Sequence, residues 1–173
     1  QPGRVLVDMA HVALGSFFML SGFVLAHGYG RMRWDGPGLR RYLVARFARV
    51  YPVYLLSLLI IAPIAVRQLD AGGVGVAAAY VLLLQAWAAM PVDWNAPAWS
   101  LSCELFFYLC FPVAVVLFSG SRRRTLLLAA LALALPVAVR AAGLPKAWKP
   151  PLYLGDFLMG MALAAVYEHL VKR

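Results

Sequence analysis

Six apolar stretches follow one another along the chain, separated by short polar segments. They cover residues 11–28, 50–66, 76–90, 98–118, 125–143 and 153–167. A helix that spans a bilayer takes about 20 apolar residues, whereas a spanning barrel strand alternates polar and apolar residues. The stretches are long and do not alternate. The pattern therefore predicts an all-α fold, a multi-pass transmembrane helical bundle with about six apolar segments.

Proline and glycine punctuate this pattern. Residues 67–75 contain Gly72, Gly73 and Gly75 and are predicted to turn the chain. Prolines inside the apolar stretches should kink the helices, or break them where polar groups line a cavity. These prolines are Pro52, Pro63, Pro112 and Pro136.

The composition agrees with a lipid environment. Of the 173 residues, 64% are hydrophobic and 13% are charged, and the mean hydropathy is +0.79. No polar stretch is long enough for a separate basic domain, which argues against nucleic acid as a partner. We therefore expect residues 1–173 to form a single integral-membrane domain whose first partner is the lipid bilayer.

The net charge of +9 bears on orientation, because cytoplasmic loops of membrane proteins are enriched in Lys and Arg. Arginines gather in residues 31–49, predicted as a loop that leads into a helix, and in residues 121–124. Three crossings separate these clusters if every segment between them spans, which would put them on opposite faces. Either one segment is re-entrant, the shortest being 76–90, or one cluster departs from the bias.

The cysteines and histidines suggest no metal site. Cys103 and Cys110 are seven residues apart, about 10.5 Å along one helix, which is too far for a disulfide between them. They are expected to be small packing residues. The three histidines are scattered, and neither a CxxC nor an HxxxH pattern occurs.

Arg46 and Arg49 stand three residues apart, on one helical face, where the second segment enters the membrane. Two guanidinium groups placed there could hold a phosphate-bearing ligand through paired hydrogen bonds. The alternative is that both side chains reach into the lipid headgroups and anchor the topology. The sequence leaves both interpretations open.

Ser100, Glu104 and Tyr108 are spaced four residues apart and share nearly one face of the fourth segment. A carboxylate between hydroxyls at membrane depth could accept a proton, orient a histidine or bind a sugar. Alternatively, Glu104 is a structural partner for an arginine of another helix. Trp99 could be an interfacial aromatic residue.

The first segment, GSFFMLSGFVLAHGYGR, carries His27 near its polar end. Such a histidine is either a base or an interfacial side chain. Ser21 and Gly22 fit close helix packing, because small residues let backbones approach in lipid. No GxSxG pattern surrounds Ser21, which argues against a hydrolase nucleophile. Asp156 is the last charge inside an apolar segment, and Gly160 follows it in a further small-residue packing face.

Four motifs, taken in order, resemble the membrane-bound acyltransferase 3 family. They are SFFMLSGF, RFAR followed by Tyr51-Pro52, WSLSCELFFYLCFP and DFLMGMALA, and the resemblance covers most of residues 11–165. Members of this family transfer acyl groups, often acetyl, from acyl-CoA to hydroxyls of polysaccharides, glycolipids or macrolides. The resemblance thus implies a membrane O-acyltransferase that binds no resident cofactor and uses acyl-CoA as donor substrate, with a sugar or glycolipid as acceptor.

The resemblance also assigns roles to single residues. Arg46 and Arg49 would belong to the acyl-CoA region, and Trp99, Ser100 and Glu104 to the core motif, with Tyr108 beside it. Glu104 and His27 are the catalytic candidates of this chain. The family's catalytic histidine lies further upstream of the first motif, so it is expected before Gln1.

The resemblance further predicts that residues 1–173 are part of an acyltransferase 3 domain truncated at both ends, with activity in the intact parent. It implies a bacterial cytoplasmic membrane as the location. Two other classes remain open on the residues alone. A transporter or flippase would use Glu104 and Asp156 to line a sugar or lipid path. A packing subunit would need Glu104 for assembly alone.

Overall fold

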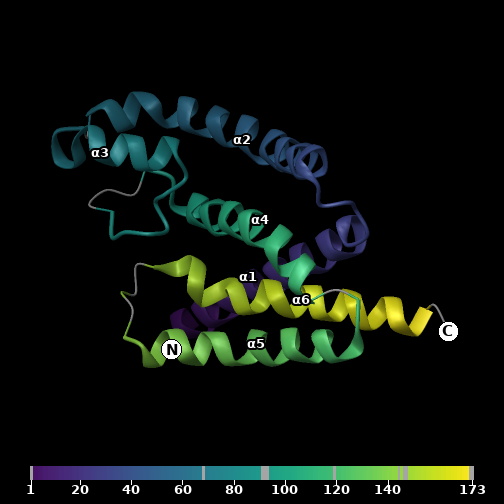
Figure 1. The fold of residues 1–173 in the computed structure, drawn as a ribbon. Helices are drawn as coiled ribbons and strands as arrows, with labels where there is room; N and C mark the ends of the chain where they lie inside the picture. The colour runs from purple at the N-terminus through teal and green to yellow at the C-terminus, as the bar shows by residue number, and fades with distance from the viewer. Residues whose placement is uncertain are drawn as a thin grey trace. The chain divides into compact units, whose positions relative to one another are not determined.

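The computed structural model describes residues 2–67, 69–90, 94–118, 120–143, 145 and 148–171, and the side chains of residues 2–11 and 69–72 are not described. Across these residues the chain forms helices and connecting turns (Figure 1). The elements are α1 (Pro2–Tyr29), α2 (Gly36–Arg67), α3 (Leu69–Val81), the 3-10 helix η1 (Ala96–Ala98), α4 (Trp99–Phe118), α5 (Arg122–Ala141) and α6 (Lys149–Val171). This confirms the all-α prediction.

The chain divides into two compact units. Unit 1 is drawn from Gln1–Arg33, Phe111–Leu144 and Pro151–Arg173, so it contains α1, the end of α4, α5 and most of α6. Unit 2 is drawn from Trp34–Cys110 and Pro145–Pro150 and contains α2, α3 and most of α4. The candidate residues of α2 and α4 that precede Phe111 thus belong to unit 2, and His27 belongs to unit 1.

Among the described residues, five stretches of helix are long and apolar enough to cross a bilayer, and α3 is not among them. With 13 residues, α3 is about 20 Å long, whereas a hydrocarbon core is about 30 Å thick. In the described part of the chain between Arg31 and Arg122, α2 and α4 are therefore the candidate spans, and two crossings would return both arginine clusters to one face. This favours the re-entrant alternative for residues 76–90.

The predicted loop of residues 31–49 is mostly helix, which corrects the sequence interpretation. α2 begins at Gly36, because the Asp35 carboxylate accepts a hydrogen bond from the N–H of Gly38 at 2.9 Å. Aspartate at this position supplies an acceptor for the unpaired N–H groups of a first turn, and Pro37 suits that turn. Arg46 and Arg49 are consequently fixed on a helix before it enters the apolar stretch.

The prolines inside α2, α4 and α5 do not break these helices, since each helix continues past its proline. A proline removes a single intrahelical hydrogen bond, and neighbouring groups in a bundle can compensate for it. Within residues 67–75, where a turn was predicted, the helix α3 is interrupted at Gly73, which has a left-handed φ of 63°. Gln68, also within that predicted turn, lies outside the described residues.

The apolar stretch 76–90 is helical only as far as Val81, which agrees with the re-entrant alternative and not with a spanning helix. Leu83 adopts a left-handed φ of 56°, which ends the helix within an apolar sequence. Carbonyl groups freed there need donors, because lipid offers none. Hydroxyls from α2 and α4 supply them: Tyr54 donates to Tyr80 at 2.5 Å, Tyr51 to Val81 at 3.1 Å, and Ser102 to Leu83 at 2.5 Å.

Unit 1 is held together by direct contact between the backbones of α1 and α6. A Cβ added to Gly22 would overlap the carbonyl oxygen of Phe157, and one added to Gly160 would overlap that of Met19. Phe18 and Phe157 are fully buried beside this crossing. The structure thus confirms that Gly22 and Gly160 act as small packing residues, which is how helices associate closely in lipid.

Gly22→Ala tests this crossing. The added methyl group must push the α6 backbone away, so we expect the free energy of unfolding to fall by about 1–3 kcal/mol. Gly28→Ala is the matched control on the same helix, because a Cβ there meets nothing within 4 Å. The control should be neutral or slightly stabilising. Thermal or chemical unfolding in detergent measures both variants, and equal effects would contradict the packing role of Gly22.

Candidate functional site

Arg46, Glu104 and Tyr108 lie together in unit 2, where α2 packs beside α4. The hydroxyl of Tyr108 donates a hydrogen bond to the Glu104 carboxylate at 2.5 Å. The guanidinium carbon of Arg46 lies 5.9 Å from the centre of the Tyr108 ring, within the range of a cation–π interaction. The three side chains therefore form a continuous row from cation to aromatic ring to carboxylate.

The carboxylate and the tyrosine of this row are buried, so their hydrogen bond is protected from solvent. Glu104 is 7% exposed and Tyr108 is 3% exposed, while Arg46 is half-buried and Arg49 is exposed. A buried carboxylate is costly unless it is hydrogen-bonded, and Tyr108 provides such a bond. Arg49, one turn beyond Arg46, also acts electrostatically on Tyr108. Two arginines of α2 thus contribute positive charge to the Tyr108–Glu104 pair.

The backbone at this point is fixed from α2 as well. The hydroxyl of Tyr42, which is fully buried, donates to the carbonyl oxygen of Tyr108 at 3.1 Å. The indole ring of Trp34 meets the Tyr42 ring edge to face, with centroids 5.3 Å apart. The amino-terminal half of α2 therefore holds the Glu104–Tyr108 turn of α4 in register.

The space beside the row is small. A cavity of about 10 Å³ lies between Arg46, Tyr51, Leu105 and Tyr108, which is close to the least volume that admits one water molecule. The row is consequently packed, and Arg49, which is not part of the row, is the exposed cation one turn beyond Arg46. A phosphate-bearing ligand would meet the exposed Arg49 first.

Ser100 and Trp99 lie apart from this row, at the beginning of α4. The Ser100 hydroxyl donates to the Pro97 carbonyl at 2.9 Å, and the Lys149 ammonium lies 4.2 Å above the Trp99 ring. Tyr108 is nine residues beyond Trp99, about 13.5 Å along the helix. Of the two hydroxyls expected to flank Glu104, Tyr108 bonds to it directly, and the bond recorded for Ser100 goes to the turn before α4.

His27 lies in unit 1 and is 56% exposed. Its Nδ1 is 4.0 Å from a carboxylate oxygen of Glu168, whose other oxygen accepts a hydrogen bond from Arg31 at 3.0 Å. The imidazole stacks on Phe23 and meets the ring of Tyr167 edge to face. The structure thus places His27 in an aromatic and ionic cluster at the end of α1, in a different unit from Glu104.

Comparison with known proteins agrees with the four motifs. The model of the acyltransferase 3 family, described as an acyltransferase domain, matches residues 3–173. The chain belongs to the acyltransferase 3 family. It is 31% identical over 196 aligned residues to the acyltransferase MdmB of Streptomyces mycarofaciens, covering 97% of this chain. It is 50% identical over 56 residues to protein 2 in the picA locus of Rhizobium radiobacter, covering 31% of this chain.

The alignments span only part of these relatives: 49% of MdmB and 28% of the picA-locus protein. No solved structure shows a significant match to the chain. Within this family chain, the Arg46 and Glu104 motifs meet in space, while the His27 motif folds into unit 1. The catalytic histidine expected before Gln1 falls outside the described residues.

Sequence reasoning missed a second polar cluster of this acyltransferase-family chain. Gln85 is 6% exposed, and its amide donates to the Ala98 carbonyl at 2.9 Å and to the Tyr54 hydroxyl at 3.4 Å. Asn95 donates to the Ser57 hydroxyl at 3.0 Å. An amide inside the apolar run VLLLQAW was the sign that could have revealed this cluster. It ties the chain after α3 to α2 and to the start of α4.

Tyr108→Phe tests whether the carboxylate depends on the tyrosine. The variant keeps the ring beside Arg46 but removes the donor to buried Glu104, so we expect the free energy of unfolding to fall by about 1–3 kcal/mol. Tyr167→Phe is the control, because Tyr167 is 46% exposed; its effect should stay within about 0.5 kcal/mol.

A double-mutant cycle with Glu104→Gln completes the test. If the two side chains interact as described, the combined loss will be smaller than the sum of the single losses. Additive losses in unfolding experiments would contradict the pairing of Tyr108 with Glu104.

Proposed function

We propose that the protein containing this chain is a membrane O-acyltransferase. It would move an acyl group, in the first instance acetyl, from acyl-CoA to a hydroxyl of a sugar, polysaccharide or glycolipid. The observation that carries the proposal is the row of Arg46, Tyr108 and Glu104, formed by two motifs of an acyltransferase family. The name of MdmB, an acyltransferase aligned with nearly the whole chain, supports the reaction class.

The arginines are assigned to the donor. Acyl-CoA carries several phosphates, and guanidinium groups bind phosphate oxygens through paired, charge-assisted hydrogen bonds. Arg49 is exposed and Arg46 is half-buried one turn before it, so the pair can reach an anionic ligand from one helical face. Two candidate crossings separate the two arginine clusters, so both clusters can lie on one face of the membrane. This and the positive-inside bias support placing this end of α2 toward the cytoplasm, where acyl-CoA is made.

Glu104 is assigned to positioning at the reaction centre. In acyl transfer, the acceptor hydroxyl oxygen bonds to the thioester carbonyl carbon, its proton passes to a base, and the bond to sulfur breaks. A buried carboxylate fixed by Tyr108 can orient a base. Trp99 and Ser100 complete the core motif at the start of α4, and His27 is kept as a second candidate base.

The protein is assigned to the cytoplasmic membrane of a bacterium. Five apolar helices support an integral membrane protein, and both relatives come from bacteria. The donor is a substrate released as free CoA, and we propose no resident cofactor. Binding donor and acceptor side by side would make the bimolecular transfer effectively unimolecular, which lowers its entropic barrier.

The donor assignment is tested with Arg46→Ala and Arg49→Ala in the full-length protein. Loss of one charge-assisted phosphate contact is worth about 1.5–3 kcal/mol, so we expect acetyl-CoA affinity to fall roughly tenfold to a hundredfold. Arg67→Ala is the control, because Arg67 is exposed at the other end of the same helix. Isothermal titration in detergent measures the affinity, and unchanged binding in both variants would overturn the assignment.

A further inference from the structure

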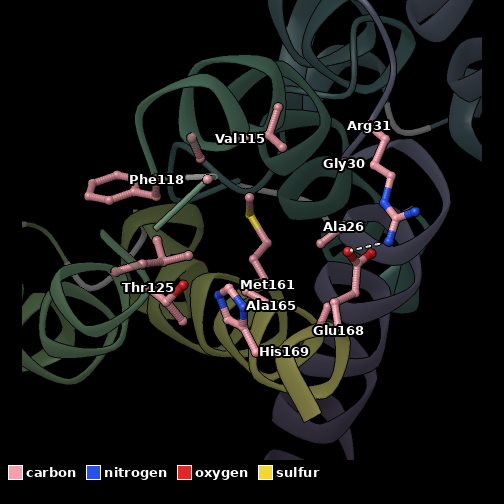
Figure 2. Close-up of a pocket in the computed structure, with 14 residues that line it drawn as sticks. Ala26, Gly30, Arg31, Val115, Phe118, Thr125, Met161, Ala165, Glu168 and His169 are labelled. Carbon is pink, nitrogen blue, oxygen red and sulfur yellow. Dashed lines mark hydrogen bonds and ion pairs between the residues drawn. The ribbon is translucent and has the colours of Figure 1, made fainter. Parts of the chain in front are cut away.

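Unit 1 contains a cavity of about 640 Å³ that the acyl-transfer residues do not use. Its size falls in the range of small-molecule sites, about 300–1,000 Å³. The carboxyl ends of α1 and α4, the carboxyl-terminal half of α6 and the first two turns of α5 surround it. Figure 2 shows Phe118 and Thr125 along one side and Arg31 and Glu168 along the other, with Met161 and His169 between them in this view.

Small residues create the space. Ala26, Gly30, Ala114, Ala164 and Ala165 line the cavity and leave it unfilled. The larger lining side chains include Val115, Phe118, Leu128 and Met161, which are apolar. The walls are therefore suited to a hydrocarbon chain.

The rim of the cavity is charged. Arg31 and Glu168 form an ion pair at 3.0 Å, with side chains 64% and 24% exposed. Such a partly exposed pair contributes little stability, so its two charges can be exchanged for those of a ligand. A ligand that offers a phosphate to Arg31 and an ammonium group to Glu168 would satisfy both.

The cavity also lies at a defined depth. Each surrounding helix reaches it at the end that faces the arginine clusters of residues 31–33 and 121–124. Basic residues of this kind mark the level of the lipid headgroups. An apolar cavity with a zwitterionic rim at that level matches an amphiphile taken from the bilayer.

We propose that this cavity is a binding site for a phospholipid with an ammonium headgroup, of the phosphatidylethanolamine class. One acyl chain occupies the space left by the small residues. The phosphate pairs with Arg31 and the ammonium group donates hydrogen bonds to Glu168. The inference does not rest on the proposed acyl transfer, because none of Arg46, Glu104, Tyr108 and His27 lines the cavity. His27 is related to it only through its 4.0 Å approach to Glu168.

The experiment measures lipid retention by the purified full-length protein with native mass spectrometry. Dioleoyl-phosphatidylethanolamine, -phosphatidylcholine and -phosphatidylglycerol are offered at equal concentrations. We expect the ethanolamine lipid to be retained roughly tenfold more than either other lipid, since only its headgroup offers a hydrogen-bonding cation and a phosphate together. Equal retention of all three lipids would overturn the proposal.

Two variants locate the site. Ala165→Leu places a larger side chain in the cavity and should reduce retention of the ethanolamine lipid at least about fivefold; Ala134→Leu, at an exposed position of α5 outside the cavity, should leave it unchanged. Glu168→Gln should remove the preference for ethanolamine over choline and still allow a chain to bind. Ala26→Leu replaces Ala165→Leu if the latter unfolds, as judged by gel filtration.

A competition experiment with palmitoyl-CoA distinguishes a phospholipid site from a binding site for the acyl-CoA donor. Palmitoyl-CoA should not displace the ethanolamine lipid, and Ala165→Leu should leave acyl-CoA affinity and acyl transfer unchanged. Displacement by palmitoyl-CoA would overturn the phospholipid assignment. A preference for ethanolamine that survives Glu168→Gln would do the same. Failure of acyl transfer in the unaltered protein bears on the proposed function alone.

Discussion

The bilayer imposes one constraint on the whole fold: every backbone polar group within the hydrocarbon core must be hydrogen-bonded to another group of the protein. Long helices do this by themselves. Where α3 ends after Val81, the chain cannot, and hydroxyl groups of α2 and α4 take up the freed carbonyls. The polar side chains of unit 2 thereby hold a non-helical segment that lipid would otherwise not tolerate. The same packing brings Arg46 beside Tyr108.

The two units meet the constraint with different chemistry. Unit 2 relies on tyrosine, serine and glutamine hydrogen bonds, which fix α4 in register with α2 through Tyr42. Unit 1 relies on close backbone contact, because Gly22 and Gly160 allow α1 and α6 to touch. Small residues that permit this contact also leave space where side chains are missing, as in the cavity beside Ala164 and Ala165. Packing and a potential lipid site thus have a common origin.

Much of the fold was predictable from local pattern. Apolar length gave the helices, and the small residues at Gly22 and Gly160 indicated the packing face. Two features were not specified by the local pattern: residues 31–49, expected to be a loop, are mostly helix, and residues 76–90, left open as spanning or re-entrant, are helical only as far as Val81. In the first case the Asp35 cap starts α2 well before the apolar stretch. In the second, hydroxyl groups of α2 and α4 donate hydrogen bonds to the carbonyls that are left unpaired where α3 ends. The spacing of apolar residues predicts neither a helix cap nor hydrogen bonds between side chains of one helix and the backbone of another.

The sequence by itself determined the solvent, the helical class and the family, because these depend on composition and on motifs within single segments. It also placed Glu104 and Tyr108 on one helical face, because four-residue spacing is a local property of a helix. Only the tertiary structure decided that Arg46 joins this pair and that His27 contacts Glu168 instead. Contacts between helices depend on how faces pack, and a single segment does not specify that packing.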